Sequence, residues 1–84
     1  MMDKNIKIKI FSISKGLEEK TGIKIIRIKS KYYNLLIMVD YLPIVGEIEG
    51  NIDFELATDS FSYKNIKGYF IHSNNIFNLI IKEV

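Results

Sequence analysis

A chain of 84 residues holds one small domain, and such a domain removes only about 60 to 65% of its unfolded surface from water, so a partner that covers more surface would stabilise it. The formal net charge of +2 indicates no polybasic or acidic tail, and the absence of cysteine excludes disulfides, thiolate nucleophiles and cysteine-ligated zinc. A chain without cysteine fits a reducing compartment, so we expect a cytoplasmic location. Lysines interrupt the apolar residues of the first 13 positions, and we expect neither a signal peptide nor a membrane span.

The N-terminal third predicts two or three strands. Isoleucines at positions 6, 8 and 10 alternate with Lys7, Lys9 and Phe11, which predicts a strand with one buried and one solvated face. Residues 14–19 indicate a turn followed by a short strand, and the pair Thr21-Gly22 indicates a break. The next apolar residues change phase at Ile25-Ile26, so we predict a β-bulge there.

The middle of the chain predicts a hairpin and a second break. Residues 30–34 indicate a loop, and residues 35–39 are an apolar run of strand length. A break is expected at residues 40–43, because the residue before Pro43 is pushed towards extended or turn geometry. Residues 44–49 then resume in extended form, and Gly50-Asn51 has the composition of a hairpin turn.

The C-terminal third continues as short strands joined by turns. Ile52, Phe54 and Leu56 alternate with polar residues, which predicts another half-buried strand. The remaining segments predict a turn at 58–60, a strand at 61–63, a connection at 64–67, a strand at 68–72, a hairpin turn at 73–75 and a strand at 76–82. About eight to ten short strands without a helical period predict an all-β fold of antiparallel strands, a small β-sandwich or a closed barrel, forming a single domain over residues 1–84.

The sequence predicts no enzyme and no cofactor. Glu47 and Glu49 share a strand face about 7 Å apart by strand rise, but nothing nearby in sequence would raise the pKa of either one, and a solvated strand end explains them better. His72 is the only histidine and lies in a predicted strand, where we expect a surface or rim position rather than a metal ligand. The five glycines form no phosphate-binding loop.

Nucleic-acid binding is the alternative function that the residues themselves suggest. Five basic residues lie on two predicted strands that could pair, and three aromatic side chains lie nearby in sequence, as in a small barrel that stacks single-stranded bases. The basic residues are Lys7, Lys9, Lys24, Arg27 and Lys29, and the aromatic residues are Phe11, Tyr32 and Tyr33. A solvated face in a lysine-rich chain explains the same pattern, so we expect no nucleic acid as the principal partner.

The whole chain resembles the N-terminal β-sandwich domain of the ε subunit of F-type rotary ATPases, through the order and spacing of several short motifs. That family opens with an alternating strand ending near a serine, as here at Ser12, and continues with a strand rich in Val and Ile, here residues 25–28. The loop at 30–34, the strand at 35–39, the turn at 40–43 and the stretch 44–50 follow in the family's order. The late Gly68-Tyr69-Phe70 and Asn74-Asn75 resemble the family's Gly-Gly-Phe and Asn-Asn hairpin. Direct matches in these stretches are Pro43, Gly50, Gly68 and Phe70.

The resemblance implies a non-catalytic central-stalk subunit that binds a γ-like rotor shaft below an F-type α/β hexamer, at the cytoplasmic face of the membrane. The shaft-facing residues would be Ser12, Asp40, Tyr41 and Leu42, and the loop facing a membrane c-ring would be Lys31, Tyr32, Tyr33 and Asn34. This loop is bulkier than in the family and carries no negative charge. The resemblance ends at Val84, where the family's C-terminal helical hairpin would begin, so we expect no such hairpin.

Overall fold

A computed structural model describes residues 4–82 of the chain. Two predictions therefore concern residues that lie partly outside this range. One is the lack of a signal peptide at the start of the sequence, and the other is the lack of a helical hairpin at its end. The described part contains seven strands: β1 (Ile6–Ser12), β2 (Gly16–Ile23), β3 (Ile25–Ser30), β4 (Asn34–Met38), β5 (Ile44–Glu55), β6 (Ser60–Ser73) and β7 (Ile76–Lys82). It includes no helix long and apolar enough to cross a membrane.

The seven strands form one hydrogen-bonded sheet in the order β2-β1-β7-β6-β5-β3-β4. The all-β prediction is confirmed. All neighbouring strands are antiparallel except β1 and β7, which run parallel, so the sheet is mixed rather than purely antiparallel. Strands β2 and β4 are the two edges.

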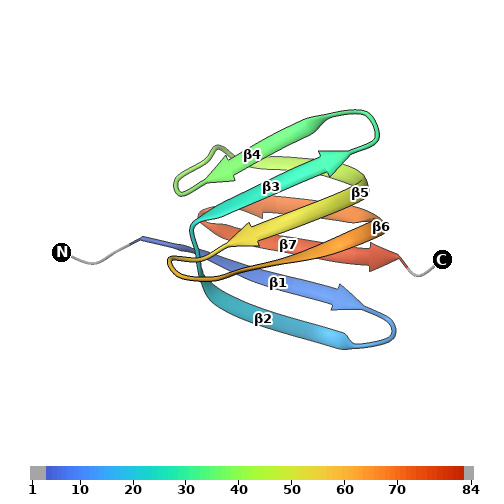
Figure 1. The fold of residues 1–84 in the computed structure, drawn as a ribbon, viewed down its shortest axis with the longest axis horizontal. Coiled ribbons are helices and arrows are strands. Elements are labelled where there is room, and N and C mark those ends of the chain that lie inside the picture. Colours follow the sequence, from blue (N-terminus) through green and yellow to red (C-terminus); the bar gives the residue numbers. More distant parts are fainter. Residues whose placement is uncertain (1–3, 83–84) are drawn as a thin grey trace.

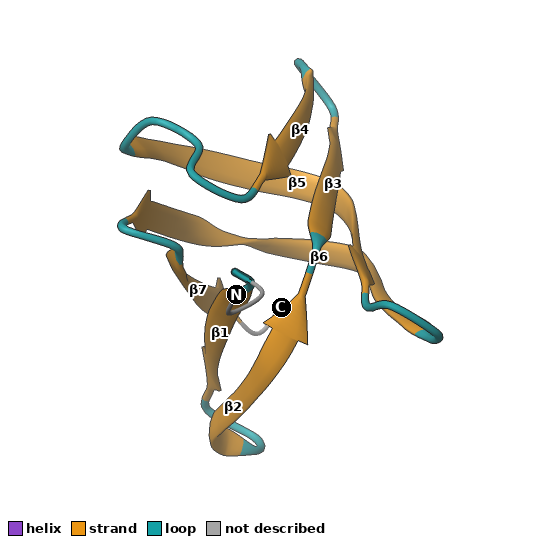
Figure 2. Cartoon of the chain, turned by 90° about the vertical axis from the view of Figure 1, so that its left-hand side faces the viewer, coloured by secondary structure: helices purple, strands orange, loops and turns teal. Residues whose placement is uncertain are grey.

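The long hairpin of β5 and β6 bends in the middle and folds this sheet into two facing layers (Figures 1 and 2). One layer, called the β1 layer, contains β2, β1 and β7 with residues 67–73 of β6 and 44–49 of β5. The other, called the β3 layer, contains residues 60–63 of β6 and 51–55 of β5 with β3 and β4. In Figure 1 both long strands turn at the right-hand end of the molecule.

The bend lies at Gly50 of β5 and at an extra residue on β6. The pairing of β5 with β6 shifts register between Gly50 and Ile52, where Asn65 adopts a positive φ of 56°. Gly50 has a φ of 154°, and a Cβ on it would lie 2.2 Å from the carbonyl oxygen of Lys29, so only glycine fits there. The predicted hairpin at Gly50-Asn51 and the predicted connection at residues 64–67 are therefore wrong. Each is a bend within one strand, and this is why there are seven strands instead of eight to ten.

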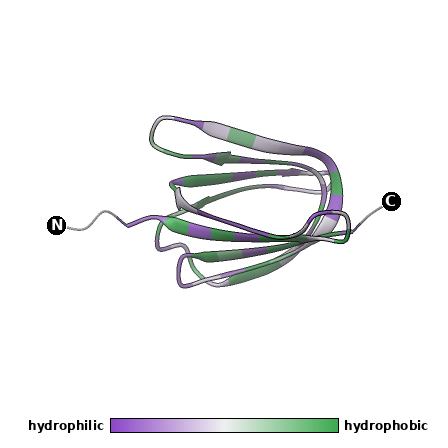
Figure 3. Cartoon of the chain, turned by 90° about the horizontal axis from the view of Figure 1, so that it is seen from below, coloured by the Kyte–Doolittle hydropathy of each residue, from purple (hydrophilic) through white to green (hydrophobic). Residues whose placement is uncertain are grey.

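One hydrophobic core fills the space between the layers. The isoleucines of β1 and the pair Ile52 and Phe54 of β5 are buried, as their alternation predicts. The ring of Phe54 lies 6.1 Å from that of Phe77, which joins β5 in the β3 layer to β7 in the β1 layer. Hydrophobic and hydrophilic residues alternate along the strands in Figure 3. This alternation gives each layer an inner and an outer face.

Two further details of the strands differ from the predictions. The pair Thr21-Gly22 lies within β2, where a register shift opposite Ile6 and Ile8 and the positive φ of Gly22 mark a bulge. No irregularity occurs at Ile25, since β3 pairs in regular register with both neighbours. The change of phase in the sequence reflects the passage of the chain from one layer to the other between β2 and β3.

Candidate partner-binding surface

An apolar row crosses the outer face of the β1 layer. Leu17, Phe11, Ile80 and Tyr69 are direct cross-strand neighbours on β2, β1, β7 and β6. Their side chains are exposed by 58, 46, 50 and 43%. They point outward because the residues that alternate with them, such as Ile10, fill the core. The two hairpins β1–β2 and β6–β7, from opposite ends of the chain, thus build one continuous apolar strip.

The next row on the same face extends this strip. Ile71 and Val45 are paired neighbours on β6 and β5, exposed by 53 and 69%. We call these six residues (Leu17, Phe11, Ile80, Tyr69, Ile71 and Val45) the outer apolar band. An exposed apolar patch of this kind marks an interaction site in a soluble domain.

Charged side chains border the outer apolar band. Lys7 and Glu19 form an ion pair of 3.1 Å between β1 and β2, and the hydrogen bond from Lys7 holds the pKa of Glu19 below its usual value. At the other border, the Lys82 ammonium lies 5.0 Å from the centre of the Tyr69 ring. An apolar centre with a charged border is the usual anatomy of a protein–protein interface.

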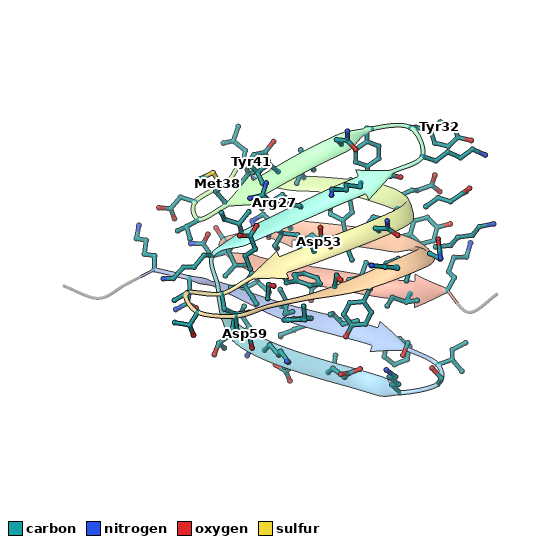
Figure 4. All side chains as sticks on the ribbon, in the orientation of Figure 1. Arg27, Tyr32, Met38, Tyr41, Asp53 and Asp59 are labelled. Atoms are coloured by element: carbon teal, nitrogen blue, oxygen red, sulfur yellow. The ribbon has the colours of Figure 1, made fainter. Side chains whose placement is uncertain are left out.

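Charged pairs occupy the outer face of the β3 layer along β3 and β5. Arg27 pairs with Glu55 at 2.5 Å, and Lys29 lies 3.8 Å from Asp53. Arg27 and Asp53 lie on the face towards the viewer in Figure 4. Paired surface charges of this kind suit contact with water. The outer apolar band therefore belongs to the β1 layer, whereas the outer face of the β3 layer is charged along β3 and β5 and apolar at β4, where Leu36 and Met38 are exposed.

The expected shaft-facing turn lies between β4 and β5, with three side chains in different settings. Leu42 is 76% exposed. Tyr41 is half-buried and packs against the core. Asp40 exchanges two hydrogen bonds with Asn75 and pairs with Lys4 at 3.0 Å, and these contacts, with the Asn75 bond foremost, lower the pKa of the Asp40 carboxyl. Leu42 is thus the side chain of this turn that is most available to a partner.

Ser12 lies at the opposite end of the molecule from that turn. It ends β1, whose arrow points to the right in Figure 1, whereas β4 runs to the left into Asp40. Ser12 is only 6% exposed, and its Oγ accepts a hydrogen bond from the backbone N–H of Lys15 at 3.3 Å. Ser12 therefore shapes the β1–β2 turn, and the four expected shaft-facing residues form no single patch.

The expected ring-facing loop joins β3 to β4. Tyr32 projects from its tip and is 79% exposed (Figure 4). Tyr33 is half-buried, and its hydroxyl donates a hydrogen bond to the backbone carbonyl of Glu47 in the other layer. Burial and the nearby Glu47 carboxylate raise the pKa of Tyr33. Tyr33 is therefore a structural link between the layers, and Tyr32 is the exposed ring of the loop, with the Lys31 ammonium 5.4 Å from its centre.

The premise of the nucleic-acid alternative is wrong, because β1 and β3 do not pair. Strand β1 lies between β2 and β7, and β3 lies between β4 and β5, so Lys7 and Arg27 occupy the outer faces of different layers. Lys7, Arg27 and Lys29 are also each paired with a carboxylate. Within the described part of the chain, these basic side chains therefore form no common face.

His72 is in the core rather than at the surface or rim. It is 0% exposed, and its ring lies 6.0 Å from that of Phe77. Among the residues that the structure describes, neither ring nitrogen has a hydrogen-bond partner, and burial lowers the pKa of the imidazole. Glu47 lies on the outer face of β5, away from His72. Within residues 4–82, no three His, Cys, Asp or Glu side chains are grouped to hold a metal ion.

Known protein-family models and curated proteins contain no match to this sequence. The fold is similar to that of a chain in a cryo-EM structure of the Tetrahymena thermophila mitochondrial ATP synthase central stalk/c-ring, with a TM-score of 0.74 and 14% sequence identity. The match covers 99% of this chain and 67% of that chain. At 14% identity this similarity establishes the fold alone. It confirms the β-sandwich that the resemblance implies.

Proposed function

We propose that this chain is a non-catalytic subunit in the central stalk of an F-type or F-like rotary ATPase, where it binds a γ-like shaft and helps couple rotation to ATP turnover. The observation that carries the proposal is the fold similarity over 99% of the chain to a chain of an ATP synthase central stalk/c-ring structure. ATP synthesis or hydrolysis would occur in α and β partner subunits.

The outer apolar band is the proposed contact with the shaft. Phe11 and Tyr69 bring large rings with few rotatable bonds, which makes aromatic residues common anchors in interfaces. Their neighbours Ile80 and Ile71 surround them with further apolar surface.

Affinity purification of the tagged chain from its own cells tests the function. The proposal expects ATPase α, β and γ-like chains among the proteins that stay bound at moderate salt. Recovery of nucleic acid or ribosomal proteins in their place would contradict it and would restore the alternative of a nucleic-acid-binding module. A c-ring recovered with the shaft would support the additional contact that the resemblance implies for residues 31–34.

A further inference from the structure

The two edges of the sheet are protected to very different degrees. The outward backbone groups of an edge strand can pair with another chain, and proteins usually prevent this with charges, prolines or bulges. Edge strand β2 carries Glu18, Glu19 and Lys20 and contains the bulge at Gly22. Edge strand β4 reads Asn-Leu-Leu-Ile-Met and has no charge, proline or bulge. Strand β4 is therefore an unprotected edge.

The outward backbone groups of β4 follow from its pairing with β3. The N–H of Ser30 donates to the carbonyl of Tyr33 at 2.9 Å at the base of the hairpin. Hydrogen-bonded and non-hydrogen-bonded pairs alternate along an antiparallel ladder, so the backbone groups of Asn34, Leu36 and Met38 point away from β3. In agreement, the carbonyl of Met38 accepts a hydrogen bond from the N–H of Tyr41 in the following turn.

Exposed apolar side chains accompany this edge along its whole length. Leu36 and Met38 on β4 are exposed by 42 and 50%. Tyr32 and Leu42, in the loops at the two ends of β4, are exposed by 79 and 76%. Tyr32 and Met38 lie at opposite ends of the strand in Figure 4. None of the four belongs to the outer apolar band, so β4 forms a second and separate apolar surface.

We propose that β4 pairs with β4 of a second copy of this chain, antiparallel and centred on Leu36. This register uses the whole strand: Leu36 faces its own copy, Asn34 faces Met38, and Leu35 faces Ile37. The outward groups of Leu36 then pair with those of its own copy at the two-fold axis, and the N–H of Met38 donates to the carbonyl of Asn34. The Met38 carbonyl already accepts the N–H of Tyr41, and its second lone pair accepts the N–H of Asn34. The inner faces also match, because Leu35 and Ile37 both pack towards the core of the β3 layer.

The two ends of β4 complement each other in this arrangement, and this selects a second copy as the occupant. Antiparallel pairing brings the loop before β4 in one copy beside the turn after β4 in the other. The exposed ring of Tyr32 then lies beside the partner's exposed Leu42, and this apolar contact occurs at both ends of the same strand. Lys31 and Asp40 keep their own partners there, since Lys31 pairs with Glu49 at 3.7 Å and Asp40 with Lys4 at 3.0 Å. The dimer uses a different surface from the outer apolar band and does not depend on the proposed shaft contact.

Sedimentation velocity of the purified chain over a wide range of concentration tests the dimer. We expect a monomer–dimer equilibrium. Leu36→Lys places two cations at the two-fold axis and should raise the dimer dissociation constant at least about tenfold. Leu36→Pro removes only an outward N–H and should have the same effect, while circular dichroism reports whether each variant is folded. Phe11→Ser should leave the dimer unchanged. A chain that stays monomeric throughout, or a dimer that persists in folded Leu36→Lys, would overturn the proposal.

Single cysteines test the register without weakening the edge, because the natural chain contains none. Leu36→Cys should form a disulfide-linked dimer under mild oxidation, since paired Cα atoms about 5.5 Å apart are within disulfide range. Asn34→Cys alone should cross-link poorly, and a mixture of Asn34→Cys and Met38→Cys should cross-link well. Equal cross-linking of all single variants would show random collision and contradict the register.

Discussion

Asp40 and Asn75 bind each other twice, through one side-chain pair and one side-chain–backbone pair. The backbone N–H of Asp40 donates to Asn75 Oδ1 at 2.7 Å, and Asn75 Nδ2 donates to Asp40 Oδ1 at 3.0 Å. Both residues have positive φ angles, which Asp and Asn tolerate better than most residues. The carbonyl of Asn75 also accepts the N–H of Lys7. The turn after β4 is thereby tied to the β6–β7 hairpin and to β1.

The variant Asn75→Gly isolates this link, because glycine keeps the backbone conformation and removes the amide. The free energy of unfolding should fall, and the pKa of Asp40, followed by NMR titration, should rise towards its usual value. Asp40 is more acidic in the folded state, so its contribution is complete above the unfolded pKa of about 3.9 and is lost as the pH falls below it. The neighbouring Asn74→Gly is the control. A pKa of Asp40 that does not change in Asn75→Gly would contradict the link.

Gly50→Ala tests the bend that folds the sheet. We expect the free energy of unfolding in urea to fall by more than about 3 kcal/mol, because the new Cβ meets the Lys29 carbonyl oxygen. Gly16→Ala is the matched control: its φ of 73° is also positive, but nothing lies within 4 Å of the added Cβ. It should cost about 1 kcal/mol. Similar losses in the two variants would mean that backbone conformation alone, and not the close approach of β3, requires Gly50.

His72 should make stability depend on pH near neutrality. Its pKa in the folded state lies below the unfolded value of about 6.5, so the unfolded chain binds more protons in that range. The free energy of unfolding should be constant above about pH 6.5 and should decline as the pH falls below it. In His72→Leu this decline should disappear, and stability at pH 7 should rise by about 1 kcal/mol, since no buried polar nitrogen is left unpaired. Parallel pH profiles for the two proteins would show that another group titrates.

A pair of substitutions on β1 tests the assignment of inner and outer faces. Ile8→Asp should unfold the domain, because an unpaired buried carboxylate costs several kcal/mol. Phe11→Asp lies on the same strand but faces outward, and it should leave the circular dichroism spectrum and the unfolding transition nearly unchanged. If Ile8→Asp keeps full stability in a denaturant titration, β1 does not face the core as described.

Local sequence patterns predict most of the strands. They fail where a contact with a residue distant in the sequence determines the backbone conformation. The alternation of Ile6, Ile8 and Ile10 and the Asn74-Asn75 turn depend on neighbouring residues only, and both are present as expected. Gly50-Asn51 has the composition of a hairpin turn. What makes it a bend is the Lys29 carbonyl of β3, which no local pattern reveals.

The surface residues were harder to predict than the strands. The outer apolar band needs Phe11 of β1 beside Ile80 of β7, and this contact depends on a parallel pairing between the two ends of the chain. The available signal was that Phe11 takes a lysine's place in the outward alternation of β1. The sequence predicts a surface or rim position for His72, because no second histidine or cysteine accompanies it, but its neighbours in the sheet, Ile44 and Phe77, pack in or against the core.

The most direct measurement is the amount of γ-like shaft that stays bound to tagged variants purified from the native cells, determined by quantitative mass spectrometry. Phe11→Ser combined with Ile80→Ser removes the centre of the outer apolar band. Leu36→Ser removes a side chain of similar exposure from the β3 layer. We expect the natural chain and Leu36→Ser to retain the shaft and the double variant to lose at least about nine-tenths of it. Equal retention by all three proteins, or the absence of any shaft from the natural chain, would contradict it.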